Sequence, residues 1–188
     1  MLSMNSMKLN RPEAMSQCLF DLEATGLLRC GSTIHCLVIR DVDTPTGHAL
    51  YDHRKSHHLD VGIKRLEAAD LLIGHNIIGY DIPLIKEQHA SFNPSGQVLD
   101  TLVLSRLFYP HLVDRDYERR PDGMPAKLYG RHSLEAWGYR LKCHKGSFAT
   151  AGGVWDKYTP EMASYCVQDT EVTLKLFQLM QRRINEHT

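Results

Sequence analysis

Two acidic residues, Asp21 and Glu23, interrupt a run of residues that otherwise has the apolar composition of a buried strand. Side chains two positions apart in a strand point to the same face of the sheet, so the two carboxylates should lie side by side. Ionised carboxylates are costly to bury without a partner of opposite charge, and paired acids have few structural uses in a central strand. The pair therefore predicts a binding site for a divalent cation.

A third acidic residue, Asp169, lies within a helix expected near the end of the sequence. Five residues follow one another at steps of four, three, four and three, which is the spacing of one helical face: Tyr165, Asp169, Val172, Leu176 and Leu179. This face should pack on the sheet, where a carboxylate without a partner is destabilising or takes up a proton. Binding to a cation offsets that cost. A plain core position remains the alternative for Tyr165.

The segment Asn76-Ile77-Ile78-Gly79-Tyr80-Asp81 follows a short buried strand expected at residues 71–74. Open α/β sheets place their binding sites just beyond the carboxyl ends of the strands, so Asp81 is expected to join the other acids. The alternative is structural. Asp81 precedes Ile82 and Pro83, and an aspartate at this position is also typical of a helix N-cap.

Hydrophobic periodicity and turn residues predict the elements that must position these side chains. We expect strands at residues 18–23, 33–42, 49–53, 71–74 and 98–100, and helices at 61–69, 82–89, 101–109, 134–141 and 160–184. The first three strands predict an antiparallel meander, and the later helices predict an α/β fold with a mixed sheet covered on both faces. Residues 110–132 show no period and are expected to form a structureless, functional connection.

Length and composition are those of a single soluble domain. We expect one domain over residues 17–188 of the 188-residue chain, preceded by a flexible N-terminal tail at residues 1–16. Basic and acidic residues are equal at 22 each, so any contact with nucleic acid should be local. Five cysteines without a CxxC pair favour reduced thiols over a zinc site at Cys30 or Cys143. No segment is apolar and long enough to span a membrane.

Three short motifs occur in a fixed order along the chain: Asp21-x-Glu23, Asn76-x-x-x-Tyr80-Asp81 and Tyr165-x-x-x-Asp169. This ordered set resembles the motifs of the DEDD 3′-to-5′ exonucleases, in the tyrosine-bearing (DEDDy) subtype. Residues 100–106 and 132–141 are similar to the proofreading exonuclease domain of family-A DNA polymerases from short-tailed phages. The resemblance extends over roughly residues 18–182 and implies an RNase H-like fold.

The resemblance also implies two divalent cations, Mg²⁺ or Mn²⁺, at the scissile phosphate. Asp21, Glu23 and Asp169 would hold the cation that activates water, and Asp21 would also reach the second cation. Asp81 would act on the second cation, which stabilises the leaving 3′ oxygen. Tyr165 would orient the nucleophilic water, since a tyrosine pKa near 10 makes it a poor base at neutral pH.

Substrate contacts are implied by the same resemblance. Leu27 would wedge between the terminal bases, although an ordinary core position is its alternative. The backbone at Ala24 and Thr25 would meet the 3′ hydroxyl, and Asn76 and Tyr80 would touch the last nucleotides. Residues 115–145 carry eight lysines and arginines against four acids, and we expect them to follow the phosphates of the strand. A solvated surface is the alternative for these charges.

The expected function is removal of nucleotides from the 3′ end of single-stranded or frayed DNA, in DNA replication or repair. The chain ends before a polymerase domain would begin, so we expect a stand-alone proofreading module that acts apart from, or alongside, a separate DNA polymerase. The expected location is the cytoplasm of a bacterium or a phage-infected host. One rival is a 3′-to-5′ exoribonuclease acting on RNA. Another is a catalytically silent module that binds a strand or docks a polymerase, which does not need all four acids and the tyrosine.

Overall fold

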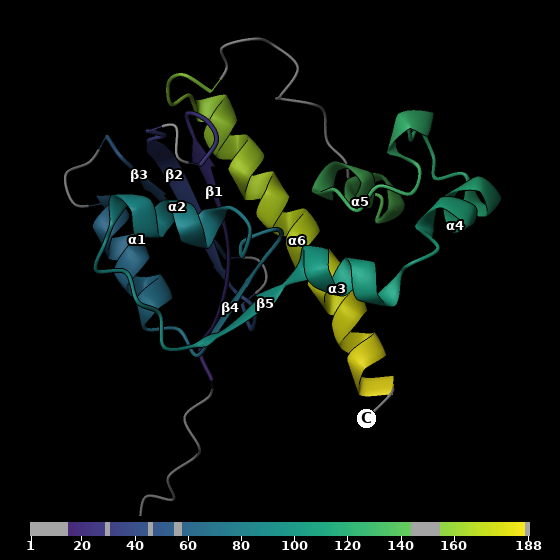
Figure 1. Ribbon diagram of the computed structural model, residues 1–188, viewed down its shortest axis with the longest axis horizontal. Coiled ribbons are helices and arrows are strands. Elements are labelled where there is room, and N and C mark those ends of the chain that lie inside the picture. Colours follow the sequence, from purple (N-terminus) through teal and green to yellow (C-terminus); the bar gives the residue numbers. More distant parts are fainter. Residues whose placement is uncertain (1–14, 29–30, 45–46, 55–57, 144–154, 187–188) are drawn as a thin grey trace, which may run out of the picture.

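A five-stranded mixed sheet forms the centre of the fold in the computed structural model (Figure 1). The structure describes residues 15–28, 31–44, 47–54, 58–143 and 155–186. The strands are β1 (Gln17–Ala24), β2 (Ile34–Asp41), β3 (Ala49–Asp52), β4 (Leu71–Gly74) and β5 (Gln97–Asp100). The helices are α1 (His58–Glu67), α2 (Asp81–Gln88), α3 (Thr101–Phe108), α4 (Leu112–Arg119), α5 (Leu134–Arg140) and α6 (Pro160–Glu186), with a 3₁₀ turn at Ala126–Leu128.

The sheet has the strand order β3-β2-β1-β4-β5. The pairs β1–β2 and β2–β3 are antiparallel, whereas β1–β4 and β4–β5 are parallel. The predicted antiparallel meander and mixed sheet are therefore confirmed. Strand β1 lies in the middle of the sheet, where both of its faces are covered.

Side chains of β1 alternate between two cores. Phe20 and Leu22 pack with Leu66 of α1 and Leu84 of α2, whereas Leu19 packs with residues of α6. Helices α1 and α2 thus cover one face of the sheet and α6 covers the other (Figure 1). Asp21 and Glu23 share the parity of Leu19, so the alternation directs them to the α6 side.

The prediction of a structureless segment at residues 110–132 is wrong, because α4 and the 3₁₀ turn lie within it. The buried residues of α4 are Leu112 and Asp116, one helical turn apart. Asp116 is buried because its carboxylate pairs with Arg140 of α5 at 2.7 Å and accepts the backbone N–H of Gly130. Because the charged Asp116 lies on the buried face of α4, the sequence of this helix shows no hydrophobic period.

The helix predicted at residues 134–141 forms α5, and its predicted cap is present, because the Ser133 hydroxyl accepts the backbone N–H of Ala136. The other predicted elements form with ends shifted by at most three residues. The predicted tail at residues 1–16 falls largely outside the described residues, and the single domain at 17–188 stays a prediction. The described cysteines, Cys18, Cys36, Cys143 and Cys166, are buried; Cys30 lies outside the described residues. No described helix is long and apolar enough to cross a membrane.

Candidate active site

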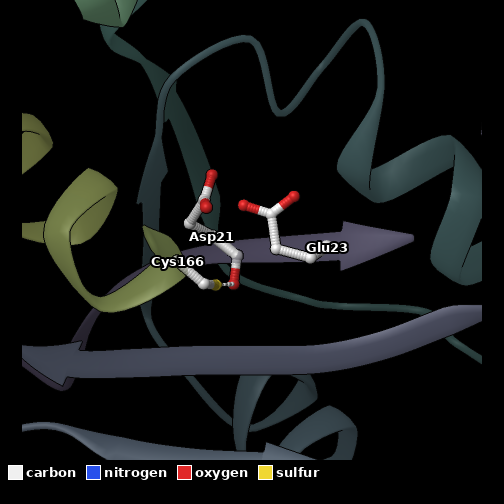
Figure 2. Close-up of side chains that lie close together, drawn as sticks. All are labelled: Asp21, Glu23 and Cys166. Atoms are coloured by element: carbon white, nitrogen blue, oxygen red, sulfur yellow. Dashed lines mark hydrogen bonds between the residues drawn. The ribbon is translucent and has the colours of Figure 1, made fainter. Parts of the chain in front are cut away.

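The carboxylates of Asp21 and Glu23 point to the same side of β1 (Figure 2). Together with the sulfur of Cys166 in α6, each offers an atom within 4.8 Å of the others. The Glu23 side chain is buried and the Asp21 side chain is half-buried. Two carboxylates held this closely can share a cation, and the strand pleat is sufficient to hold them so.

Cys166 joins this group through the backbone rather than through the carboxylates. Its thiol donates a hydrogen bond to the backbone carbonyl of Asp21, with a sulfur-to-oxygen distance of 3.3 Å (Figure 2). Burial raises the pKa of the thiol, so the sulfur stays protonated. A protonated thiol is a poor ligand for a hard cation. Cys166 therefore connects α6 to β1 next to the acids. The sequence alone did not predict this role.

The acids influence one another strongly. Burial raises the pKa of Asp21 well above its usual range, and the charges of Glu23, Asp169 and Asp81 raise it further. Burial likewise raises the pKa of Asp169 to about 7, against a hydrogen bond from Tyr165 that lowers it. Four carboxylates from β1, α2 and α6 thus lie within electrostatic reach of one another. This oxygen-rich, mutually repelling set has the chemistry of a site for hard divalent cations.

Asp81 is the first residue of α2 and is buried. Tyr80 occupies the N-cap position, so the alternative of Asp81 as the N-cap is wrong. Burial raises the pKa of Asp81 to about 7, while hydrogen bonds from the backbone of Asp81 and of Leu22 in β1 lower it. The bond from Leu22 ties the Asp81 carboxylate to the strand that carries the other acids.

The Tyr165 hydroxyl is directed at the acids. Burial raises its pKa well above the usual range, and the charges of Asp169, Glu23 and Asp21 raise it further. The phenol therefore stays protonated and acts as a hydrogen-bond donor to Asp169. The ring of Trp155 meets the Tyr165 ring edge-on, with the centroids 6.0 Å apart.

The predicted substrate contacts lie around the end of β1. Ala24 is buried at the end of the strand, Thr25 is exposed after it, and the Leu27 side chain is 74% exposed. The hydroxyl of Tyr80 donates to the backbone carbonyl of Gly26 and so holds this loop beside α2. An exposed leucine contradicts the alternative that Leu27 belongs to the core.

Asn76, the remaining predicted contact, follows β4. It is exposed and has a positive φ of 65°. Its backbone N–H donates to the Asp100 carboxylate at 2.9 Å. This bond fixes the backbone of the loop between β4 and α2, which leads to Tyr80 and Asp81.

His35 is a neighbour of the site that the sequence did not reveal. Its Nε2 lies 3.2 Å from the Thr25 hydroxyl and 3.1 Å from the backbone carbonyl of Trp155. The imidazole thus connects the loop after β1 with the segment that precedes α6. His35 and Trp155 are 120 residues apart in the sequence. No spacing pattern predicts a contact over such a separation, so the sequence did not identify this histidine.

The basic residues predicted to follow the phosphates do not form a uniform set. Arg119, Arg120 and Arg131 are exposed, whereas Arg140 is paired with Asp116 at 2.7 Å. Lys145 lies outside the described residues. The exposed arginines are therefore the ones available for a strand, and Arg140 has a structural partner.

Two viral proteins are related to the chain by sequence. It is 34% identical over 179 residues to the DNA-directed DNA polymerase of Enterobacteria phage T3, and equally to that of Escherichia phage T7. Each match covers 84% of this chain and 25% of the polymerase, so the chain spans a quarter of the length of these relatives. No protein-family model matches the chain.

Several solved structures share the fold. A nuclease in its apo form superposes with a TM-score of 0.64 at 17% identity, covering 92% of this chain and 74% of that one. Brucella melitensis NrnC bound to pGG gives a TM-score of 0.61 at 15% identity, covering 92% and 75%. The same protein with bound Mg²⁺ gives 0.58 at 17% identity, with the same coverage. These similarities confirm the predicted RNase H-like fold.

Proposed function

Because the chain belongs to the DEDD family of 3′-to-5′ exonucleases, we propose that it hydrolyses nucleotides from the 3′ end of single-stranded or frayed DNA. The observation that carries this proposal is the convergence of four carboxylates from three separate elements, with Tyr165 beside them. DNA is chosen over RNA because both viral relatives are DNA-directed DNA polymerases.

Four carboxylates would hold two divalent cations, Mg²⁺ or Mn²⁺: those of Asp21, Glu23, Asp81 and Asp169. The repulsion that raises the pKa of Asp21 supports this assignment, because bound cations offset it. When bound, such cations stabilise the charge that develops on the phosphate and on the attacking and leaving oxygens. The structure of Brucella NrnC with Mg²⁺ supports the use of a divalent cation by this fold.

The chain's own residues position the reactants. Tyr165 stays protonated, so its hydroxyl orients the attacking water by a hydrogen bond and does not remove the proton. The exposed Leu27 side chain would separate the last bases, while Thr25 and Asn76 would contact the terminal nucleotides. His35 would position Thr25, because it contacts the threonine hydroxyl at 3.2 Å.

Replacing Tyr165 with phenylalanine should slow hydrolysis by roughly 10- to 100-fold, because the water loses one orienting hydrogen bond while the carboxylates remain. The measurement is single-turnover cleavage of a 3′-labelled DNA oligonucleotide. Tyr51→Phe is the matched control, since Tyr51 packs in the core on the α1 side of the sheet, on the face opposite α6. A rate unchanged by Tyr165→Phe would remove the tyrosine from the site.

Neutralising Arg119, Arg120 and Arg131 together should flatten the salt dependence of single-strand binding. Each lost phosphate contact makes the negative slope of log binding constant against log salt concentration shallower by about 0.7, so losing three makes it shallower by about 2. The measurement is fluorescence anisotropy of a labelled oligonucleotide over a range of salt. The control removes three lysines from other helices: Lys64, Lys86 and Lys175, all of them exposed. Equal slopes in the two triple variants would show that the arginines do not follow the strand.

DNA should be degraded about tenfold or more faster than RNA of the same sequence, since a 2′ hydroxyl must be accommodated beside the terminal 3′ end. The measurement follows loss of the terminal nucleotide from matched DNA and RNA oligonucleotides. Faster degradation of RNA would favour the rival exoribonuclease. A DNA primer with a mismatched 3′ end, compared with a paired one, tests the proposed proofreading role beside a separate polymerase in the cytoplasm.

A further inference from the structure

A cavity lies away from the acids, where α4, α5 and the C-terminal half of α6 meet. Its volume is about 510 Å³, and none of its lining residues belongs to the candidate active site. Leu179 of α6 lines it, ten residues after Asp169. At 1.5 Å per residue, this places the cavity about 15 Å along the helix axis from the acids.

The lining of this cavity is strongly cationic. Five basic side chains contribute to it: Arg115, Arg119, Arg120, Arg140 and Lys142. The acidic side chains are Asp116 and Asp122, and Asp116 is already paired with Arg140. The remaining positive charges face the cavity without an equal number of acids, which favours an anionic ligand.

Arg140 supplies a buried donor without a partner. Its side chain is 9% exposed, and its Nε and Nη2 donate to the two carboxylate oxygens of Asp116 at 2.9 and 2.7 Å. Its Nη1 has no hydrogen-bond partner among the described residues. The guanidinium group also lies 4.9 Å from the centre of the Trp137 ring. Because Nη1 is closed off from water, Arg140 contributes positive charge to the cavity wall, and the hydrogen bonds to a ligand come from the other basic side chains.

Another part of the wall is apolar and aromatic. The rings of Tyr109 and Trp137 meet edge-on at 5.2 Å and are buried behind this side. The half-buried Leu141 and Leu179 give it an accessible apolar surface. The guanidinium group of Arg115 lies 5.1 Å from the centre of the Tyr109 ring. The volume is within the range of about 300–1,000 Å³ that is typical of small-molecule sites. A ligand that fits such a cavity combines an anionic group with a flat, weakly polar body.

We propose that this cavity binds a nucleotide, with its phosphate at the arginines and its base against the apolar wall. The nucleotide is either a free nucleoside monophosphate or a residue of a bound strand upstream of its 3′ end. Only the second source rests on the proposed exonuclease function. Arg119 and Arg120 then contact the phosphate at the cavity mouth.

Binding is tested in EDTA, where repulsion among the acids keeps nucleotides out of the candidate active site and no cleavage is needed. The probes are dAMP, inorganic phosphate, a dinucleotide and a longer oligonucleotide with a blocked 3′ end, measured by calorimetry. Arg115→Gln should weaken binding of the nucleotide probe about tenfold, because a charge-assisted hydrogen bond to phosphate is removed. Lys142→Gln is a second variant, and circular dichroism checks that both are folded. Lys64→Gln is the matched control, because this exposed lysine of α1 lies outside residues 115–145 and does not line the cavity.

The outcomes separate the two sources. Weakened dAMP binding in Arg115→Gln and Lys142→Gln, but not in Lys64→Gln, supports a site for the free nucleotide. Weakening confined to the longer oligonucleotide supports a site on the strand. Equal weakening in all three variants would show general electrostatics and overturn the proposal. The proposal would also be overturned if inorganic phosphate bound as tightly as dAMP. The same holds if the two cavity variants weakened the binding of none of the probes.

Discussion

Replacing Asp21 with alanine should reduce cleavage by roughly 10³-fold or more, because removing a cation ligand removes several kcal/mol of transition-state stabilisation. Asp21 is the acid whose pKa is raised by all three of the others, Glu23, Asp169 and Asp81, which places it centrally among them. Binding of a single strand should survive, since the exposed arginines and Leu27 are untouched. The measurement pairs single-turnover cleavage of a 3′-labelled oligonucleotide with anisotropy of the same oligonucleotide.

Asp169→Ala should reduce cleavage to the same extent as Asp21→Ala. Although Asp169 lies in α6, its carboxylate belongs to the same set of cation-binding acids as those of β1. Asp43→Asn is the control, since Asp43 is exposed in the turn after β2. Its cleavage rate should equal that of the unchanged protein. Cleavage retained in either alanine variant would mean that the site has been assigned to the wrong residues.

The parts of the site that could be predicted from sequence are those with local periods. A strand alternates every residue, so Asp21 and Glu23 had to share a face once β1 was recognised. A helix repeats every 3.6 residues, so Tyr165, Asp169 and Val172 had to share one face. The prediction that this whole face packs on the sheet is wrong, because Val172 packs with residues around α3 and α5, whereas Leu174 and Phe177 of α6 pack on the sheet. The antiparallel meander needed no contact information beyond the short connections between its strands.

The parts that could not be predicted depend on contacts between distant residues. Helix α4 was missed because Asp116 lies on its buried face, and only the pairing with Arg140, 24 residues later, makes that burial favourable. His35 reaches the site through the carbonyl of Trp155, 120 residues away. Such contacts follow from packing of the whole chain, so a pattern search along the sequence has nothing to detect.

Chelation of divalent cations by EDTA should stop cleavage completely, and added Mg²⁺ or Mn²⁺ should restore it. The same cations should stabilise the folded protein, because they bind the converging carboxylates of the native state and find no such set in the unfolded chain. At a cation concentration 100 times Kd the gain is about 2.7 kcal/mol. For a chain of this length that raises Tm by about 5–10 °C. The measurement is thermal unfolding in EDTA and in a series of cation concentrations.

The variant Asp21→Asn separates this effect from general salt effects. In EDTA it should unfold at a higher temperature than the unchanged protein, because one of the repelling buried charges is removed while the shape of the side chain is kept. Added Mg²⁺ should then raise its Tm much less, since a ligand is missing. Asp43→Asn should keep the full shift. Cleavage that is indifferent to chelation would show that hydrolysis needs no cation. An equal Tm shift in Asp21→Asn and Asp43→Asn would show that the cation binds away from these acids. Either result would contradict the proposed cation site.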